Sequence, residues 1–420
     1  MNLPAAAVLL LTLVTVSATH ISLPFSPART MTRQHKSVEK LLEPSRRNQE
    51  RPQRPNQTFP KPNQSPNRNS QTNAKTRDVY LKNFYNKLYF ASITIGTPEQ
   101  KINVAFDTGS AITWVPSAHC PSRRLLHSIS GITKEYNNES SSTYKANGKP
   151  FEVSYGAGTV AGYRSQDNVA FAGTTVRNQI FGEAIIRPKM FAGSMNDGIL
   201  GLGFSNIDEG EEFTVFDNMV IQGLLPAPIF SFYLNRAGTD DPDSVLTLGG
   251  TNPDYYNGDF TFANLTAPDR WQFEIDRIQL SNSKDFALSK CQAVVDTGSS
   301  LIVGPSNEVD ALNKRLGAKP LQRGDRKLYT FDRYQLNSLP NLEFIVNGQK
   351  LSMTSRDYAA QFPGMRSGQF YSGIVGKEFQ RGETPVWSLG FSFMRTFYTQ
   401  FDKGNRRIGF AKASSFIRIY

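Results

Sequence analysis

Short segments in which apolar and polar residues alternate make up most of the chain from residue 80 onward. The segment Tyr89–Ile95 alternates with a period of two and stops at Gly96, as a strand with one buried face does. Further strands are expected at Ile102–Phe106, Phe151–Tyr155, Val245–Leu248 and Phe273–Leu280. Helical patterns are few, and the clearest is Glu308–Leu316, which follows the start signal Ser306-Asn307. The pattern predicts an all-β protein.

The first 77 residues have a different character. Residues 1–18 form a mostly apolar run that ends in Val16-Ser17-Ala18, which fits a signal peptide cleaved after Ala18 and predicts entry into the secretory pathway. Residues 19–77 begin with a short amphipathic pattern and continue as a linker rich in Pro, Asn, Gln, Ser and Arg. Two interpretations stay open for this segment, a simple tether and a removable propeptide.

The net charge of +11 is concentrated in that leading segment. Residues 20–77 carry twelve Lys and Arg against three Glu, whereas residues 78–420 carry 35 basic against 33 acidic side chains. The main body therefore has no electrostatic reason to bind nucleic acid. A basic tail that binds an anionic partner remains a third interpretation of the leading segment.

The main body contains an internal repeat. Val104-Ala-Phe-Asp107-Thr-Gly-Ser110 is echoed by Ala293-Val-Val-Asp296-Thr-Gly-Ser299, 189 residues later. A looser echo follows each copy after roughly ninety residues, Ile199-Leu-Gly201 after the first and Trp387-Ser-Leu-Gly390 after the second. One Asp-Thr-Gly is a weak signal, but two copies bounded by strands predict two related lobes, which we place at residues 78–240 and 241–420.

An apolar strand that ends in Asp-Thr-Gly presents a carboxylate on a tight loop, where Gly permits the turn. If the two lobes pair about a pseudo-twofold axis, Asp107 and Asp296 meet face to face. Two carboxylates in contact cannot both ionise cheaply, so the pair holds a single proton. The ionised Asp is then a general base for a bound water, and the protonated Asp donates a hydrogen bond to a carbonyl. Neither is a covalent nucleophile in this scheme.

The chain offers few residues for other kinds of catalysis. Of the four histidines, His20 and His35 precede the main body, and neither His119 nor His127 lies near a nucleophile-elbow pattern. The glycine-rich stretch from Gly156 to Gly162 is followed by no helical pattern, so we interpret it as a hairpin rather than a dinucleotide loop. Two cysteines are too few for a cysteine-based zinc cluster, and no metal or cofactor is expected.

These motifs resemble the pepsin-type eukaryotic aspartic proteases, in particular members like cathepsin D and renin. The resemblance covers residues 78–420 and is carried by the stretches that begin at Asp107, Ser141, Asp197, Cys291 and Phe397. It implies an all-β, bilobed fold of two barrel-like lobes related by a pseudo-twofold axis. A deep cleft would separate the lobes, and a six-stranded sheet would join them underneath. The expected activity is that of an aspartic endopeptidase made as a zymogen, with its propeptide as an intramolecular inhibitor.

The resemblance also implies roles for residues around the pair. Residues 151–163 would form a flap in which Tyr155 packs over the two carboxylates and Gly156 and Ala157 bind the backbone of the substrate. Trp114 would support Tyr155, although a plain core aromatic is an equally ordinary reading of it. Ser110 and Ser299 would stand in equivalent places beside the two carboxylates. The residues expected to support the pair are Thr108, Gly109, Ser110, Thr297, Gly298 and Ser299. Ile199 and Ser300 would line the substrate cleft.

Phe391 departs from the family pattern. The second copy of the echo reads Leu389-Gly390-Phe391, where the family usually has Leu-Gly-Asp. Loss of that carboxylate removes negative charge near the pair, whereas burial by Phe acts in the opposite direction on its proton affinity. We expect a pH optimum above that of pepsin.

Processing and location are predicted more coarsely. Sequons at Asn56, Asn63, Asn138 and Asn264 agree with passage through the secretory pathway, and the location expected is either secretion or an acidic, lysosome-like compartment. Cys120 and Cys291 are either free thiols or bonded to each other. We expect a monomer without a membrane span that acts on polypeptides.

Two alternatives to a broad endopeptidase remain. One is a narrow, renin-like processing protease, and the other is a catalytically silent relative that only binds peptides.

Overall fold

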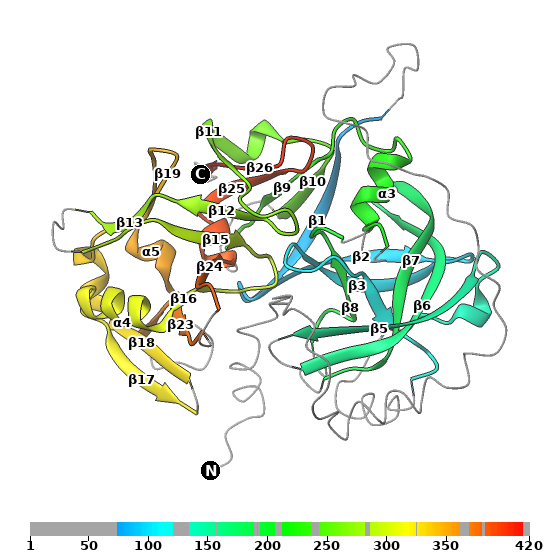
Figure 1. The fold of residues 1–420 in the computed structure, drawn as a ribbon, viewed down its shortest axis with the longest axis horizontal. Coiled ribbons are helices and arrows are strands. Elements are labelled where there is room, and N and C mark those ends of the chain that lie inside the picture. Colours follow the sequence, from blue (N-terminus) through cyan, green and yellow to red (C-terminus); the bar gives the residue numbers. More distant parts are fainter. Residues whose placement is uncertain are drawn as a thin grey trace, which may run out of the picture.

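A computed structural model describes residues 74–120, 134–155, 158–188, 191, 194–205, 212–236, 243–281, 286–324, 326–360, 369–379 and 383–414. They fold into two β-rich lobes that lie side by side, as Figure 1 shows. The predicted all-β, bilobed architecture is therefore confirmed. The segment expected as signal peptide lies outside the described residues, and so does the segment expected as propeptide, except for its last four residues, 74–77.

The described part of the N-terminal lobe holds eight strands and one short α-helix: β1 (Arg77–Phe84), β2 (Leu88–Ile95), β3 (Gln100–Asp107), β4 (Trp114–Pro116), β5 (Lys145–Tyr155), β6 (Gly158–Phe171), β7 (Thr174–Ile186), β8 (Gly198–Gly201) and α3 (Val215–Ile221). Thr214 begins α3 with a capping box, in which its side chain and that of Asp217 each accept a hydrogen bond from the other residue's backbone. Two further strands follow, β9 (Ile229–Tyr233) and β10 (Ser244–Leu248).

The C-terminal lobe has a similar make-up of short strands and short helices: β11 (Tyr256–Asn264), β12 (Gln272–Ile275), β13 (Arg277–Leu280), β14 (Ala287–Leu288), β15 (Cys291–Val295), β16 (Ile302–Pro305), α4 (Ser306–Arg315), β17 (Lys319–Arg323), β18 (Arg326–Asp332), β19 (Leu342–Val346), β20 (Gln349–Met353), α5 (Ser355–Tyr358), β21 (Ala359–Ala360), β22 (Gln369–Ser372), β23 (Ile374–Lys377), β24 (Val386–Leu389), α6 (Phe391–Met394), β25 (Phe397–Asp402) and β26 (Arg407–Ala413). The single strand expected at Phe273–Leu280 is wrong, because β12 pairs with β15 and β13 pairs with β19 in another sheet.

Six strands, from the beginning, the middle and the end of the described chain, form the part of a 13-stranded sheet that joins the lobes. Its order is β11-β26-β25-β9-β10-β1. The first half of β1 pairs with β10 in this sheet, and its last three residues pair with β2 inside the N-terminal lobe. The boundary that we predict at 240/241 falls in the connection between β9 and β10, and it stays a prediction.

The internal repeat corresponds to two copies of one strand arrangement. In the first copy β3 runs parallel to β8, β8 is antiparallel to β4, and β4 is parallel to β7. In the second copy β15, β24, β16 and β23 are related in the same way. The two Asp-Thr-Gly loops therefore begin at equivalent places in the two lobes.

Aromatic side chains fill the space where the lobes meet. Trp271 is buried against Phe401, with ring centroids 5.1 Å apart, and its indole nitrogen donates to the carbonyl of Leu202 at 3.0 Å. Phe230 stacks on Phe401 at 4.8 Å. These contacts join the two halves through packed apolar surface, which favours a fixed relative position of the two loops.

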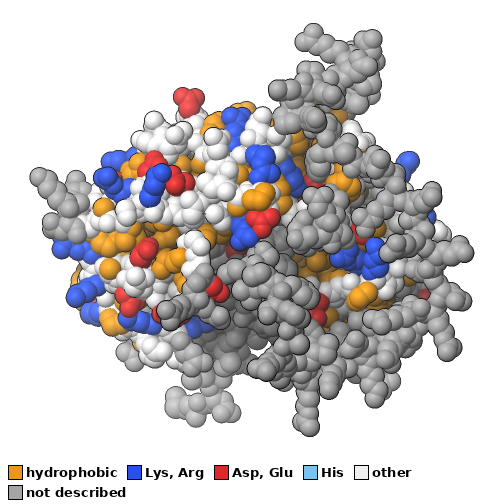
Figure 2. Space-filling view, viewed as in Figure 1, with side chains coloured by type: hydrophobic (Ala, Val, Ile, Leu, Met, Phe, Trp, Pro, Cys, Tyr) orange, Lys and Arg blue, Asp and Glu red, His pale blue; other side chains and the backbone are white. Residues whose placement is uncertain are grey.

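The surface of the C-terminal lobe mixes charges of both signs. On the face shown in Figure 2, its basic and acidic side chains alternate without a large patch of one sign. This agrees with the near-neutral balance of residues 78–420. Within the described ranges, no helix is both long and apolar enough to cross a membrane.

Candidate active site

The two predicted aspartates lie at corresponding strand ends. Asp107 is the last residue of β3, and Asp296 directly follows β15. Each has only 1 % of its surface exposed. The apolar residues before each aspartate, such as Phe106 and Val295, are buried in the core and anchor the strands.

The threonines of the two loops lock the loops together. The backbone nitrogen of Thr108 donates to Oγ1 of Thr297 at 2.9 Å, and the nitrogen of Thr297 donates to Oγ1 of Thr108 at 3.0 Å. Each hydroxyl also donates across the interface, Thr108 to the carbonyl of Val295 at 2.9 Å and Thr297 to that of Phe106 at 2.6 Å. These buried, fully paired groups fix the loops relative to each other.

The glycine after each threonine holds its own aspartate. The nitrogen of Gly109 donates to Oδ1 of Asp107 at 2.9 Å, and that of Gly298 donates to Oδ1 of Asp296 at 2.8 Å. A side chain at Gly109 would lie 2.8 Å from Oδ1 of Asp296 and 3.2 Å from Oδ1 of Asp107. Glycine is therefore required here, because both carboxylates lie close to the place that a side chain at this position would take.

The two serines of the motif are not equivalent. Ser110 donates to Oδ2 of Asp107 at 2.5 Å, as expected. Ser299 instead donates to the carbonyl of Leu301 at 3.0 Å, so its expected place beside Asp296 is corrected. One hydroxyl that donates to Oδ2 of Asp296 is that of Ser388 on β24, at 3.4 Å. Ser388 lies in the second echo of the sequence, which was the available signal for it.

This asymmetry predicts different effects of the two serines on pH dependence. The bond from Ser110 favours the ionised form of Asp107, so Ser110→Ala should raise its pKa and move the acidic limb of the kcat/KM profile up by about one pH unit. Ser299→Ala should move the limb much less. Equal shifts in the two variants would contradict the observed hydrogen bonds.

Burial and charge act on Asp107 in the same direction. Burial is the larger cause and the negative charge of Asp296 the smaller one. Together they raise the pKa of Asp107 above its ordinary value. The hydrogen bonds from Ser110 and Gly109 oppose this shift. A carboxyl pair of this kind holds one proton between its members.

The two downstream glycines pack directly beneath the loops. A side chain on Gly201 would lie 2.5 Å from the backbone of Ala111, and one on Gly390 would lie 2.2 Å from the carbonyl of Ser299. β8 and β24 can therefore support the loops only with glycine at these ends. This gives the looser echo in the sequence a structural reason.

Tyr155 and Trp114 are in direct contact, as predicted. The indole nitrogen of Trp114 donates to the Tyr155 hydroxyl at 2.7 Å, and Phe191 packs edge-on against Trp114 at 5.1 Å. Ile199 belongs to the same buried cluster. Trp114 is fully buried, so it is a core aromatic and at the same time the residue that supports Tyr155. Burial, with a smaller contribution from Asp107, raises the pKa of Tyr155, which stays protonated.

The predicted flap corresponds to the β5–β6 hairpin, in which Tyr155 pairs with Gly158. This agrees with the hairpin interpretation of the glycine-rich stretch. Gly156 and Ala157 at its tip lie outside the described residues.

A pocket lies between the lobes, beside Asp107. Residues of the first half that line it include Lys87, Asp107 and Ile199, and the second half contributes Thr297, Gly298 and Phe391. Phe391 packs edge-on against Tyr89 at 4.6 Å. It thus places an apolar ring where the family usually has a carboxylate. Ser300 donates its hydroxyl to the carbonyl of Lys87 at 2.9 Å.

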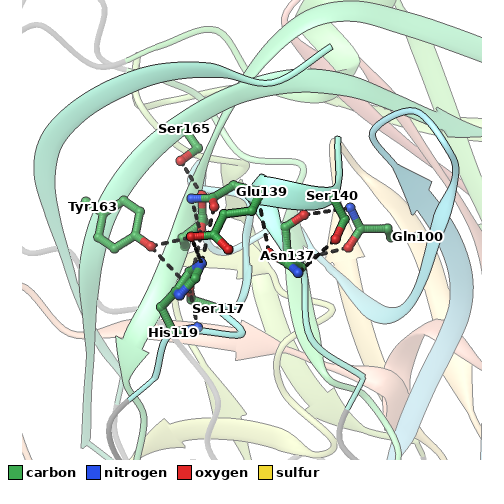
Figure 3. A network of polar contacts seen from close by, with 10 residues as sticks. Gln100, Ser117, His119, Asn137, Glu139, Ser140, Tyr163 and Ser165 are labelled. Carbon is green, nitrogen blue, oxygen red and sulfur yellow. Dashed lines mark hydrogen bonds and ion pairs between the residues drawn. The ribbon is translucent and has the colours of Figure 1, made fainter. Parts of the chain in front are cut away.

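A second polar cluster, in the N-terminal lobe, surrounds the buried carboxyl of Glu183, and Figure 3 shows its members Ser117, His119, Tyr163 and Ser165. Ser165 and Ser117 donate to this buried carboxyl at 2.5 Å and 3.0 Å, and Asn138 donates at 3.2 Å. The ring of His119 contacts Asn138 and Glu139, at 3.3 Å and 4.0 Å. Ser117 is fully buried and its hydroxyl donates a hydrogen bond to Glu183, so this cluster is no Ser-His-acid nucleophile. His127 lies outside the described residues.

The remaining predicted residues are placed as follows. Asn264 is exposed at the end of β11, whereas the side chain of Asn138 faces Glu183. Asn56 and Asn63 lie outside the described residues. Cys120 and Cys291 are not bonded to each other. The Cys120 thiol donates to the carbonyl of Ile185 at 3.1 Å, and burial raises the pKa of Cys291 to about 12.

Comparison with known proteins identifies relatives over most of the chain. Residues 88–413 match the family model described as eukaryotic aspartyl protease. Cathepsin D of Gallus gallus is 40 % identical over 333 residues, which cover 79 % of this chain and 82 % of that protein. Cathepsin D of Chionodraco hamatus is 40 % identical over 343 residues, with 81 % and 85 % covered. Cathepsin D of Homo sapiens is 38 % identical over 346 residues, with 80 % and 82 % covered.

Proposed function

The chain belongs to the eukaryotic aspartyl protease family and is an aspartic endopeptidase, and from this premise we propose that Asp107 and Asp296 are its catalytic pair. The observation that carries the proposal is the reciprocal lock between Thr108 and Thr297, which holds the two buried carboxylates at one point of the lobe interface.

The pair activates a water molecule by general acid and base catalysis. One carboxylate is ionised and removes a proton from the water, which attacks the carbonyl carbon of the peptide bond. The other is protonated and donates a hydrogen bond to the carbonyl oxygen as it becomes negative. The raised pKa of Asp107, caused by burial and by Asp296, supports a proton shared within the pair.

The substrate is a polypeptide in extended form. Tyr155, at the end of β5, covers the pair with Trp114 behind it. A hairpin in this place offers backbone hydrogen bonds to an extended chain, as an added strand would receive them. Ile199 and Phe391 supply apolar walls of the pocket, which suits peptide bonds next to large apolar side chains.

Residues 1–18 act as a signal peptide and residues 19–77 as a basic propeptide that inhibits the enzyme until it is removed. The charge balance of residues 20–77, twelve basic against three acidic, supports a segment that covers an acidic pair. The mature enzyme is a monomer of two lobes, 78–240 and 241–420. It works after secretion or in an acidic compartment.

Digestion of an unfolded protein with and without pepstatin tests this function. We expect cleavage at many bonds between large apolar residues and its loss with pepstatin. Cleavage of one or a few bonds only would favour a narrow processing protease. Absence of cleavage together with retained pepstatin binding would favour a silent peptide binder.

The pH dependence of activity is a separate prediction. Because burial and the charge of Asp296 raise the pKa of Asp107, we expect kcat/KM to peak above about pH 3 and to fall at higher pH as the shared proton is lost. A profile that peaks below about pH 3 would contradict this account of the pair.

A further inference from the structure

Arg77 is the first residue of β1, and its side chain is tied to the N-terminal lobe. Its Nη1 donates to the carbonyls of Ala172 and Gly173, each at 3.0 Å. These two residues form the turn between β6 and β7, and both have positive φ, 52° and 66°. A two-residue hairpin turn with positive φ at both positions has a defined shape, so the carbonyls that hold Arg77 have a fixed position.

Asp78, the next residue, is tied to a different part of the molecule. Its Oδ1 accepts a hydrogen bond from the Thr247 hydroxyl at 2.6 Å, and its Oδ2 accepts one from the side-chain amide of Asn252 at 3.2 Å. Thr247 lies on β10, directly opposite Asp78 in the sheet that joins the lobes. Hydrogen bonds accepted by a carboxylate are stronger than those between neutral groups. The two side chains next to the Arg77-Asp78 bond are therefore anchored at two separate places.

The backbone around this bond belongs to the joining sheet. Arg77 and Asp78 both pair with residues of β10, and the pairing continues through Leu81. Val79 and Leu81 are buried in the core. A protease binds its substrate as an extended chain in its own cleft. A cut between Arg77 and Asp78 therefore requires that β1 first leaves β10 and that both side chains leave their partners.

The residues just before β1 have a different environment. Lys75 and Thr76 are exposed and belong to no strand. Exposed segments outside regular structure are the preferred sites of proteolytic cleavage. A protease that recognises a basic residue before the scissile bond thus finds an accessible site at Lys75 and a protected one at Arg77.

We propose that maturation cuts the chain before Arg77, at the Lys75-Thr76 bond or further toward the N-terminus, and that Arg77 stays in the mature enzyme as the anchor of its first strand. Hydrolysis after Lys75 adds one water to the peptide bond and leaves a carboxylate on Lys75 and an amino group on Thr76. The proposal rests on the proposed removal of a propeptide, and it moves the end of that propeptide from Arg77 to an earlier residue.

The first residue of the mature enzyme is one test. The full chain is expressed in secreting cells, and the N-terminus of the active product is determined by N-terminal sequencing. We expect a product that contains Arg77, with Thr76 as its first residue if the cut follows Lys75. A mature enzyme that begins at Asp78 or later would overturn the proposal.

Limited digestion of the full chain with trypsin tests the anchors independently of natural maturation. Pepstatin is present to suppress self-digestion, and the rates of cutting after Lys75 and after Arg77 are followed by mass spectrometry. The unfolded chain supplies the reference rate of each bond. We expect folding to slow the cut after Arg77 at least about tenfold more than the cut after Lys75, because only the former requires local opening of β1.

Two variants separate the anchor from general loosening of the fold. Thr247→Val keeps a β-branched residue on β10 but removes the hydroxyl that donates to Asp78. It should speed the cut after Arg77 by about tenfold and leave the cut after Lys75 unchanged. Thr261→Val is the matched control, because β11 lies at the far end of the joining sheet from β1. It should change neither rate.

Equal slowing of the two cuts by folding, or a cut after Arg77 that Thr247→Val leaves unchanged, would overturn the protection of this bond by its anchors. Failure of the proposed propeptide looks different. An active enzyme that keeps residues 19–77 would refute the propeptide, and the trypsin rates would still decide whether Arg77 is anchored.

Discussion

Asp107→Asn and Asp296→Asn should each lower kcat/KM by about four orders of magnitude. Asparagine keeps the size of the side chain and an oxygen that can accept the bond from Gly109 or Gly298. The substitution removes the ionisable group that accepts a proton from the water or donates a hydrogen bond to the substrate carbonyl. The loss should therefore appear in kcat, measured on a peptide substrate, while the fold remains.

The control for this prediction is Asp254→Asn, an exposed aspartate next to β11. It should keep full activity. Circular dichroism and a thermal melt of each active-site variant should match the natural protein. Substantial cleavage by either variant, inhibited by pepstatin as before, would show that the pair is not the catalyst.

Lys403→Met should lower the free energy of unfolding by about 3 to 5 kcal/mol, the largest stability effect that we expect. Lys403 lies in the turn between β25 and β26, and its Nζ is 2.5 Å from Oδ1 of Asp217 on α3 of the other lobe. Both side chains are almost completely buried. The variant therefore leaves the carboxylate of Asp217 buried without its cation.

The same carboxylate also accepts the backbone N–H of Thr214 that begins α3, at 3.2 Å. The damage should thus extend to the helix and to the contact between the lobes. Urea unfolding is best measured in the inactive Asp107→Asn background, so that self-digestion does not distort the curve.

Two further variants show whether the buried charge is the cause. Adding Asp217→Asn to Lys403→Met removes the unpaired carboxylate and should restore part of the lost stability. Lys319→Met breaks a surface pair with Asp332 in which the Lys319 side chain is 67 % exposed, and it should cost less than about 1 kcal/mol. Similar losses for Lys319→Met and Lys403→Met would refute the role of burial.

Much of the fold could be predicted because its local signals agree with the tertiary structure. Tyr89–Ile95 lies within β2, Val245–Leu248 lies within β10, and the helix expected at Glu308–Leu316 overlaps α4. The exception is Phe273–Leu280. Phe273 and Ile275 are buried, as are Ile278 and Leu280, so the apolar positions shift by one residue in the middle. That shift marks the point where the chain passes from one sheet to another, and a period-two pattern alone does not reveal it.

The site was predictable where the repeat specified it. Asp107, Asp296 and the residues of their two loops follow from the symmetry of the motifs, because a repeated strand and loop create equivalent places. The departures are side-chain choices that symmetry does not determine. Ser299 has the same position as Ser110 in the motif, yet its hydroxyl finds a nearby backbone carbonyl, that of Leu301.

Long-range pairs could not be predicted from the sequence, for a different reason. Lys403 and Asp217 are 186 residues apart, and neither belongs to a motif. The turn that holds Lys87 packs against the catalytic loop of the other half, and no motif links these two segments. Such partners are set by the packing of the lobes, whereas composition and periodicity report on local structure only.

Titration of the Asp107 carboxyl tests most directly whether Asp107 and Asp296 share one proton. The measurement is a carbon-13 NMR titration of protein labelled at aspartate carboxyls, with the Asp107 signal assigned by its loss in Asp107→Asn. We expect the pKa of Asp107 to lie above its ordinary value of 3.8 in the natural enzyme. In Asp296→Asn it should fall, because the neighbouring negative charge is gone. An ordinary pKa in the natural enzyme, or a raised one that Asp296→Asn leaves unchanged, would contradict the shared proton.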